Sequence, residues 1–215
     1  MKTISESSAC EDQPISSASL MGETRYLTSW IDPSNLEIQE TYKRLTEGIA
    51  GQRDRITAVW EFVRDIPYTP YVKSRVLIDG RSFTQSDVWL DAGQALKATK
   101  LNCMNKSVLL ANLLRQELPA DSVWVCLNNV NVNGTDGHAV GYLKLGEDYL
   151  LETTNPEIRS PFLRARDMDI YESVIWVNDK EVRHIPSVEL REPFSICCLR
   201  WLSDYINERL CTEYI

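Results

Sequence analysis

Apolar residues recur three or four positions apart in five segments of the chain, which is the spacing of an amphipathic helix. The segment 100–115 shows this pattern most clearly, because four leucines between positions 109 and 114 form one stripe. Asn102 precedes that stripe and is a suitable N-cap. The other predicted helices span about residues 36–48, 54–65, 88–97 and 194–210.

Shorter runs with strand patterns occupy the second half of the chain. Residues 122–127 form a buried apolar run, residues 138–145 alternate between apolar and polar, and residues 149–153 and 171–182 complete the predicted strands. Residues 128–137 are rich in Asn and Gly, so we predict a flexible loop that leads to the strand beginning at His138.

The turn between the strands 138–145 and 149–153 decides which side chains share a face. If residues 146–148 form a three-residue hairpin loop, His138 lies opposite Pro156. Glu152 is then an even number of residues from that partner, so the side chains of His138 and Glu152 point to one face. A two-residue loop would place them on opposite faces.

Composition and charge narrow the classes of function. The chain has 215 residues, 43% of them hydrophobic and 25% charged, so we expect one globular domain over residues 23–215 after a loose, polar tail at 1–22. The net charge of −8 argues against a nucleic-acid partner. No stretch is long enough to span a membrane and no secretory signal is visible, so we expect a cytoplasmic protein that does not enter a membrane.

The six cysteines form neither a disulfide framework nor a zinc site, because no C-x-x-C pair occurs and the two histidines lie at no ligand spacing from them. We therefore expect reduced thiols. No loop has the spacing of a calcium site, so we expect neither a metal nor another cofactor.

Cys103, His138 and Glu152 are the candidate catalytic residues. Cys103 lies at the start of the predicted helix, where the helix dipole lowers the pKa of a thiol. His138 begins one strand and Glu152 ends the next, so a thiol, an imidazole and an orienting carboxylate follow one another along the chain. His184 is a weaker candidate for the base, and Asn155 is an alternative to Glu152 for orienting the imidazole.

These segments resemble the transglutaminase-like cysteine enzymes, a branch of the papain-like fold. The matching pieces are Cys-Met-Asn-Lys-Ser-Val-Leu-Leu-Ala-Asn-Leu-Leu-Arg, then Gly-His-Ala and Leu-Glu-Thr-Thr, within residues 53–182. The resemblance implies an α+β fold in which a helical part carries the cysteine and packs on an antiparallel sheet that carries the histidine and the acid. Leu101, Val140 and Glu152 depart from the residues usual in the family, which suggests an altered substrate cleft.

The chemistry expected from these residues is acyl transfer. His138 would accept the Cys103 proton, the thiolate would attack an amide or thioester carbonyl, and the Cys103 backbone N–H would be the first oxyanion donor. The resemblance implies Gln94 or Trp89 as the second donor. The acceptor of the acyl group, water or an amine, stays open, as does the substrate, which is a peptide, a protein or a small acyl compound. The alternative is a non-catalytic papain-like scaffold that binds a partner protein.

Overall fold

The structure is a computed structural model, which describes residues 8–10, 14–15, 25–69, 74–78, 81–85, 89–131, 135–167 and 171–184. The predicted helix at 194–210 lies outside the described residues. So does most of the predicted tail, of which Ser8–Cys10 (β1) and Pro14–Ile15 (β2) are described as strands. Backbone pairing of β1 with the strand β11 (Val182–His184) needs no apolar anchor, which is why the polar composition did not indicate it.

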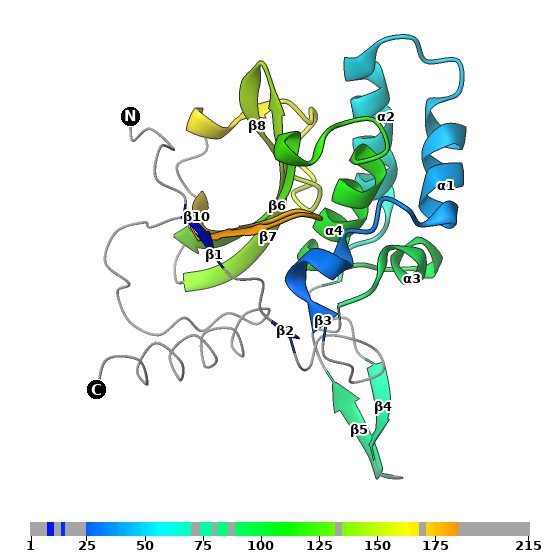
Figure 1. Cartoon of the computed structure of the whole chain (residues 1–215), viewed down its shortest axis with the longest axis vertical. Helices are drawn as coiled ribbons and strands as arrows, with labels where there is room; N and C mark the ends of the chain where they lie inside the picture. Colours follow the sequence, from blue (N-terminus) through cyan, green and yellow to red (C-terminus); the bar gives the residue numbers. More distant parts are fainter. Residues whose placement is uncertain are drawn as a thin grey trace.

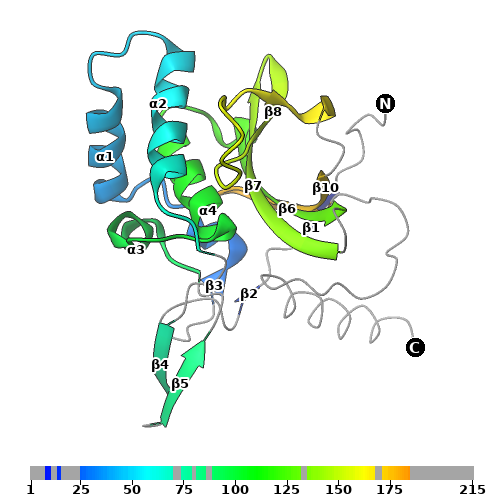
Figure 2. The same cartoon turned by 180° about the vertical axis from the view of Figure 1, so that it is seen from behind.

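Helices and a curved antiparallel sheet lie side by side, as Figures 1 and 2 show from opposite directions. This arrangement confirms the predicted α+β class. The described helices are η1 (Leu27–Trp30), α1 (Leu36–Thr46), α2 (Gln52–Asp65), α3 (Ala92–Lys97), α4 (Cys103–Leu114), η2 (Ala120–Ser122) and η3 (Ala165–Asp167). The remaining strands are β3 (Arg25–Tyr26), β4 (Ser74–Ile78), β5 (Arg81–Gln85), β6 (Val123–Asn131), β7 (Thr135–Leu145), β8 (Glu147–Leu151), β9 (Leu163–Arg164), β10 (Tyr171–Val177) and β11 (Val182–His184).

Side-chain caps start three of the four α-helices. The side-chain oxygens of Asn35 and Asn102 accept hydrogen bonds at the starts of α1 and α4, as the N-cap rule predicts. At α3, Asp91 and Gln94 form a reciprocal capping box. The predicted helices at 36–48, 54–65 and 100–115 are therefore confirmed, and α3 is shorter than the predicted 88–97 because its cap lies at Asp91.

The helix α4 is central to the domain, since all twelve of its residues are buried. It packs against α2 and α3 on one side and against β7 on the other. Gly141 of β7 allows this close approach, because a Cβ atom there would lie 3.1 Å from Leu110 of α4 and 3.1 Å from Leu151 of β8. The helix that begins with the candidate nucleophile is therefore fixed by packing on all sides.

The largest sheet of the described residues has the strand order β1-β11-β10-β6-β7-β8-β9. All of its pairs are antiparallel. Between β7 and β8 the chain reverses at Gly146, whose φ of 75° suits glycine, and Leu145 pairs directly with Glu147. The predicted three-residue loop is therefore wrong, and the register continued from this turn places His138 opposite Thr154 rather than Pro156. The shift is two residues, so the predicted common face of His138 and Glu152 is retained.

Residues 128–131 and 135–137 are paired strand residues, which corrects the flexible loop predicted from their Asn and Gly content; the rest of the predicted loop lies outside the described residues. Strand β6 continues to Asn131, β7 begins at Thr135, and Asn128 pairs with His138. Pairing along the whole hairpin outweighs the weak strand propensity of these residues. His138 is thus held inside a β-ladder.

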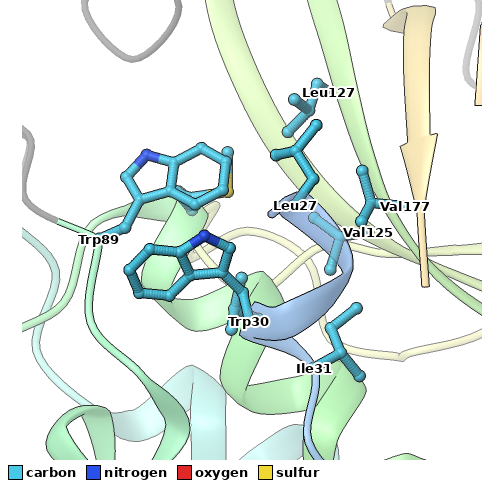
Figure 3. A pocket seen from close by; sticks show the side chains of 9 residues that line it. Leu27, Trp30, Ile31, Trp89, Val125, Leu127 and Val177 are labelled. Carbon is cyan, nitrogen blue, oxygen red and sulfur yellow. The ribbon is translucent and has the colours of Figure 1, made fainter. Parts of the chain in front are cut away.

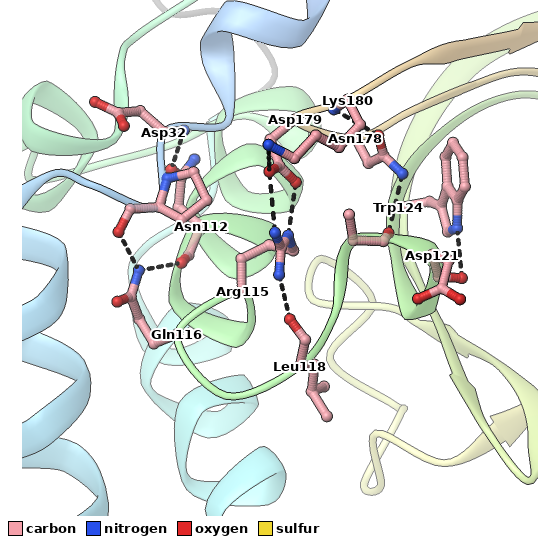
Figure 4. Close-up of polar contacts among 12 residues, drawn as sticks. Asp32, Asn112, Arg115, Gln116, Leu118, Asp121, Trp124, Asn178, Asp179 and Lys180 are labelled. Atoms are coloured by element: carbon pink, nitrogen blue, oxygen red, sulfur yellow. Dashed lines mark hydrogen bonds and ion pairs between the residues drawn. The ribbon is translucent and has the colours of Figure 1, made fainter.

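Polar contacts connect the far end of α4 to its neighbours (Figure 4). The Arg115 guanidinium forms an ion pair with Asp179 at 2.6 Å and donates to the Leu118 carbonyl. Asn112 accepts from the backbone of Asp32 at 2.7 Å, which attaches the segment before α1.

No helix in the described part of the chain is long and apolar enough to cross a membrane.

Candidate active site

Cys103 is the first residue of α4, where the helix dipole favours negative charge. The Asn102 side chain accepts from the Asn105 backbone N–H at 2.9 Å, and the Asn105 side chain in turn accepts from the Leu90 backbone N–H at 2.8 Å. The start of the helix and the segment before α3 are thereby fixed together. Cys103 is only 3% exposed.

Glu152 contacts His138 across the β7–β8 hairpin, with 2.7 Å between Glu152 Oε2 and His138 Nε2. In the continued register Glu152 lies two residues from the position opposite His138, which makes the two diagonal neighbours. Diagonal neighbours lie about 7–8 Å apart at Cα, a separation that a long side chain is needed to bridge. The length of the glutamate side chain suits this diagonal separation.

The other carboxylate oxygen of Glu152 is held by the turn that follows it. Glu152 Oε1 accepts from the Thr154 backbone N–H at 2.5 Å, from the Thr154 hydroxyl at 2.7 Å and from the Asn155 backbone N–H at 3.3 Å. The Trp60 indole of α2 donates to the Glu152 backbone carbonyl at 2.8 Å. Glu152 is 1% exposed, so both its backbone and its carboxylate are fixed in a buried setting.

Asn155, the alternative partner for the imidazole, has another role. Its side-chain oxygen accepts from the Glu157 backbone N–H at 2.9 Å, and Asn155 is exposed. The second histidine, His184, lies in β11 opposite Ile175 of β10. The contact between an imidazole and an acid is therefore made by His138 and Glu152.

The His138 ring also forms a hydrogen bond with the Cys103 side chain. Burial lowers the pKa of His138, but the hydrogen bonds and charges of Cys103 and Glu152 more than offset this and raise it. Burial raises the pKa of Glu152, and the contacts with His138 and Thr154 more than offset that effect and lower it. With Nε2 engaged by Glu152, Nδ1 is the ring nitrogen left to exchange a proton with the thiol.

Gln94 and Trp89 lie in settings that differ from each other. Gln94 Oε1 accepts from the Asp91 backbone N–H at 3.0 Å as part of the capping box of α3. Trp89 is buried edge-on against Trp30, with ring centroids 5.6 Å apart. Both indoles line a small apolar cavity between η1, α4 and the sheet (Figure 3), and Met104, next to the nucleophile, lines it too. The role of either residue as an oxyanion donor stays a prediction.

Three residues around Glu152 were not singled out from the sequence. Thr154 binds both the carboxylate and, at 3.4 Å, the imidazole. Trp60 was predicted only as part of an apolar helix face, yet its indole holds the Glu152 carbonyl. Lys106 is 1% exposed and is the one charged residue of α4. A lone lysine on a helix stripe of this kind was the one available signal in the sequence.

Two further features bear on the chemistry of the chain, the thiol of Cys126 and the arrangement of potential metal ligands. Cys126 is fully buried, and burial raises the pKa of its thiol, as expected for an unreactive core residue. Among the residues that the structure describes, no cluster of three His, Cys, Asp or Glu side chains is arranged to hold a metal ion.

Comparison with known proteins places the fold but not the family. No family model matches the chain, and no curated protein does either. Among solved structures, Legionella pneumophila LapG is similar to it. The EGTA-treated form has a TM-score of 0.53 at 13% identity, covering 86% of this chain and 95% of that chain. A second LapG structure has a TM-score of 0.54 at 13% identity, covering 86% and 94%. At this identity the likeness shows a distant relationship in fold alone.

Proposed function

We propose that this protein is a cysteine-nucleophile acyl-transfer enzyme with Cys103 as nucleophile, His138 as base and Glu152 as the orienting acid. The observation that carries the proposal is the position of His138, whose ring bonds to Glu152 on one side and to Cys103 on the other. This is the order of contacts that a thiol, a base and an orienting group need. The distant fold relationship to LapG, a transglutaminase-like cysteine protease, supports the same broad class.

The proton and electron movements balance within these residues. His138 Nδ1 takes the proton from the Cys103 thiol, and the sulfur forms a bond to the carbonyl carbon of an amide or thioester. The bond to the leaving group breaks as the imidazolium returns the proton to it, which leaves an acyl-cysteine. Water or an amine then attacks the acyl carbon, loses its proton to His138 and frees Cys103. No metal or other cofactor enters this sequence.

The negative charge that develops on the carbonyl oxygen of the substrate needs hydrogen-bond donors. The Cys103 backbone N–H lies in the first turn of α4, where N–H groups and the helix dipole favour an anion. We assign it as the first oxyanion donor, and we retain Trp89 and Gln94 as candidates for the second. The proposed setting is a cytoplasmic one, with a peptide, a protein or a small acyl compound as the substrate.

One observation favours a second candidate, a binding scaffold without catalysis. Cys103 is 3% exposed, so little of the residue is open to a substrate. In a scaffold the same three residues would serve stability, and Cys103 would form no acyl intermediate.

The test is the capture of an acyl-enzyme with a generic acyl donor. The full chain is incubated with p-nitrophenyl acetate and analysed by intact mass and peptide mapping, with Cys103→Ala and Cys126→Ala as matched controls. We expect one acetyl group on Cys103, released faster when an amine is added if the enzyme forms amides and at the same rate if it is a hydrolase. Acetylation that is absent, or equally strong in Cys103→Ala, would leave the scaffold as the better account.

A further inference from the structure

Lys106 is a buried charged residue with no role in the mechanism described above. It lies one turn after Cys103 in α4, and 1% of its surface is exposed. A buried lysine strongly destabilises the folded state unless its ammonium group is paired or hydrogen-bonded. Its retention in a helix that is otherwise mostly apolar therefore needs a structural or functional reason.

The Lys106 ammonium connects three parts of the site. Its Nζ donates to the Arg64 carbonyl near the end of α2 at 2.7 Å, and to the Thr153 carbonyl at 3.2 Å. Thr153 lies between Glu152, which contacts His138, and Thr154, which contacts both Glu152 and His138. The helix that carries the nucleophile is thus fastened directly to the turn that carries the acid.

The charges that face Lys106 come from two other elements. The negative charges of Glu152, after β8, and of Asp65, in α2, favour the ammonium form, whereas Arg64 of α2 opposes it. Burial is the largest effect, and it lowers the pKa of Lys106 to about 8. The ammonium form therefore predominates at neutral pH and is lost within a range that solution experiments reach easily.

We propose that Lys106 is a positioning residue of this site: its ammonium group holds the Glu152–Thr154 turn against α4, and loss of its charge weakens that hold. The proposal rests on the proposed acyl-transfer function. Glu152 fixes the ring of His138, so a displaced turn misdirects Nδ1 away from Cys103. A misplacement of about 1 Å costs on the order of 100-fold in rate.

The experiment follows acetylation of Cys103 by p-nitrophenyl acetate in the full chain between pH 6 and 9, with the background of Cys103→Ala subtracted. For wild type we expect a decline above about pH 8, where Lys106 loses its proton. Lys106→Met keeps the length of the chain and removes the charge, so we expect acetylation at pH 7 to fall about 10- to 100-fold and the decline near pH 8 to disappear. Lys144→Met, which removes an exposed lysine of β7, is the matched control and should behave as wild type.

Lys106→Arg keeps the test decisive if Lys106→Met does not fold. The guanidinium retains the charge and the donors and does not titrate in this range, so we expect it to recover much of the activity without the decline near pH 8. If Lys106 has only a structural role, the variants should be less stable but keep the wild-type pH profile of acetylation. That result would overturn the proposal. If wild type acetylates no faster than Cys103→Ala, the proposed function itself fails, which is a separate outcome.

Discussion

Glu152→Gln should slow the acetylation of Cys103 more than Glu152→Ala does. The reason is the set of hydrogen bonds that holds the Glu152 carboxylate. Glu152 Oε1 accepts from two backbone N–H groups, those of Thr154 and Asn155. A glutamine must therefore place its oxygen there and turn its NH2 group toward His138 Nε2. A donor at that position selects the ring tautomer with a proton on Nδ1, the nitrogen that has to accept the Cys103 proton.

The magnitude follows from the tautomer. Enforcing the wrong tautomer through the acid of a related triad lowers the rate by about 10⁴-fold. In Glu152→Ala the ring is poorly oriented but free to adopt the productive tautomer, so we expect a smaller loss. In Glu152→Asp the carboxylate retreats by about one carbon–carbon bond, ~1.5 Å, which lengthens the 2.7 Å contact beyond hydrogen-bond range.

The assay is the second-order rate constant for acetylation of Cys103 by p-nitrophenyl acetate at pH 7, measured for all three variants. Thermal unfolding serves as the control, since Glu152→Gln keeps the hydrogen bonds to the following turn and should stay folded. A Glu152→Gln variant that reacts within tenfold of wild type, or faster than Glu152→Ala, would contradict this assignment of the tautomer.

Three further substitutions test the support of the site. Gly141→Ala inserts a methyl group into a 3.1 Å contact with α4 and β8, so we expect a loss of about 1–3 kcal/mol in the free energy of unfolding by urea. Arg115→Leu leaves the mostly buried Asp179 carboxylate with only its 3.7 Å contact to the exposed Lys180, and it should cost about 3 kcal/mol at pH 7 by the same measurement. Burial raises the pKa of Asp179 and Arg115 more than offsets this, so the cost should shrink as the pH falls below about 4. Trp60→Phe removes the 2.8 Å bond to the Glu152 carbonyl, and acetylation should slow while stability falls by about 1 kcal/mol.

The sequence predicted the features that depend on local periodicity. The cap at Asn102 placed Cys103 at the start of a helix, and the alternation from His138 onward predicted β7. Side chains alternate between the two faces of a sheet, so a register error of two residues does not change the face on which a side chain lies. His138 and Glu152 were therefore correctly expected on one face although the predicted turn was wrong.

The features that the sequence did not reveal depend on partners distant along the chain. The strand character of residues 128–131 and 135–137 comes from pairing between β6 and β7, which composition does not report. The hydrogen bonds of Lys106 reach carbonyls 42 and 47 positions away. The choice of Glu152 over Asn155 was decided by the hydrogen bonds of one turn.

The central claim is that Cys103 and His138 form a reactive pair, and iodoacetamide labelling between pH 4 and 9 tests it most directly. Alkylation needs only the thiolate, so it depends on neither the substrate nor the oxyanion donors. We expect one fast site at Cys103 with an apparent pKa well below the ~8.5 of an ordinary thiol, and a rise of that pKa in His138→Ala. Labelling of Cys103 that is no faster than that of Cys10 and is unchanged in His138→Ala would contradict the account.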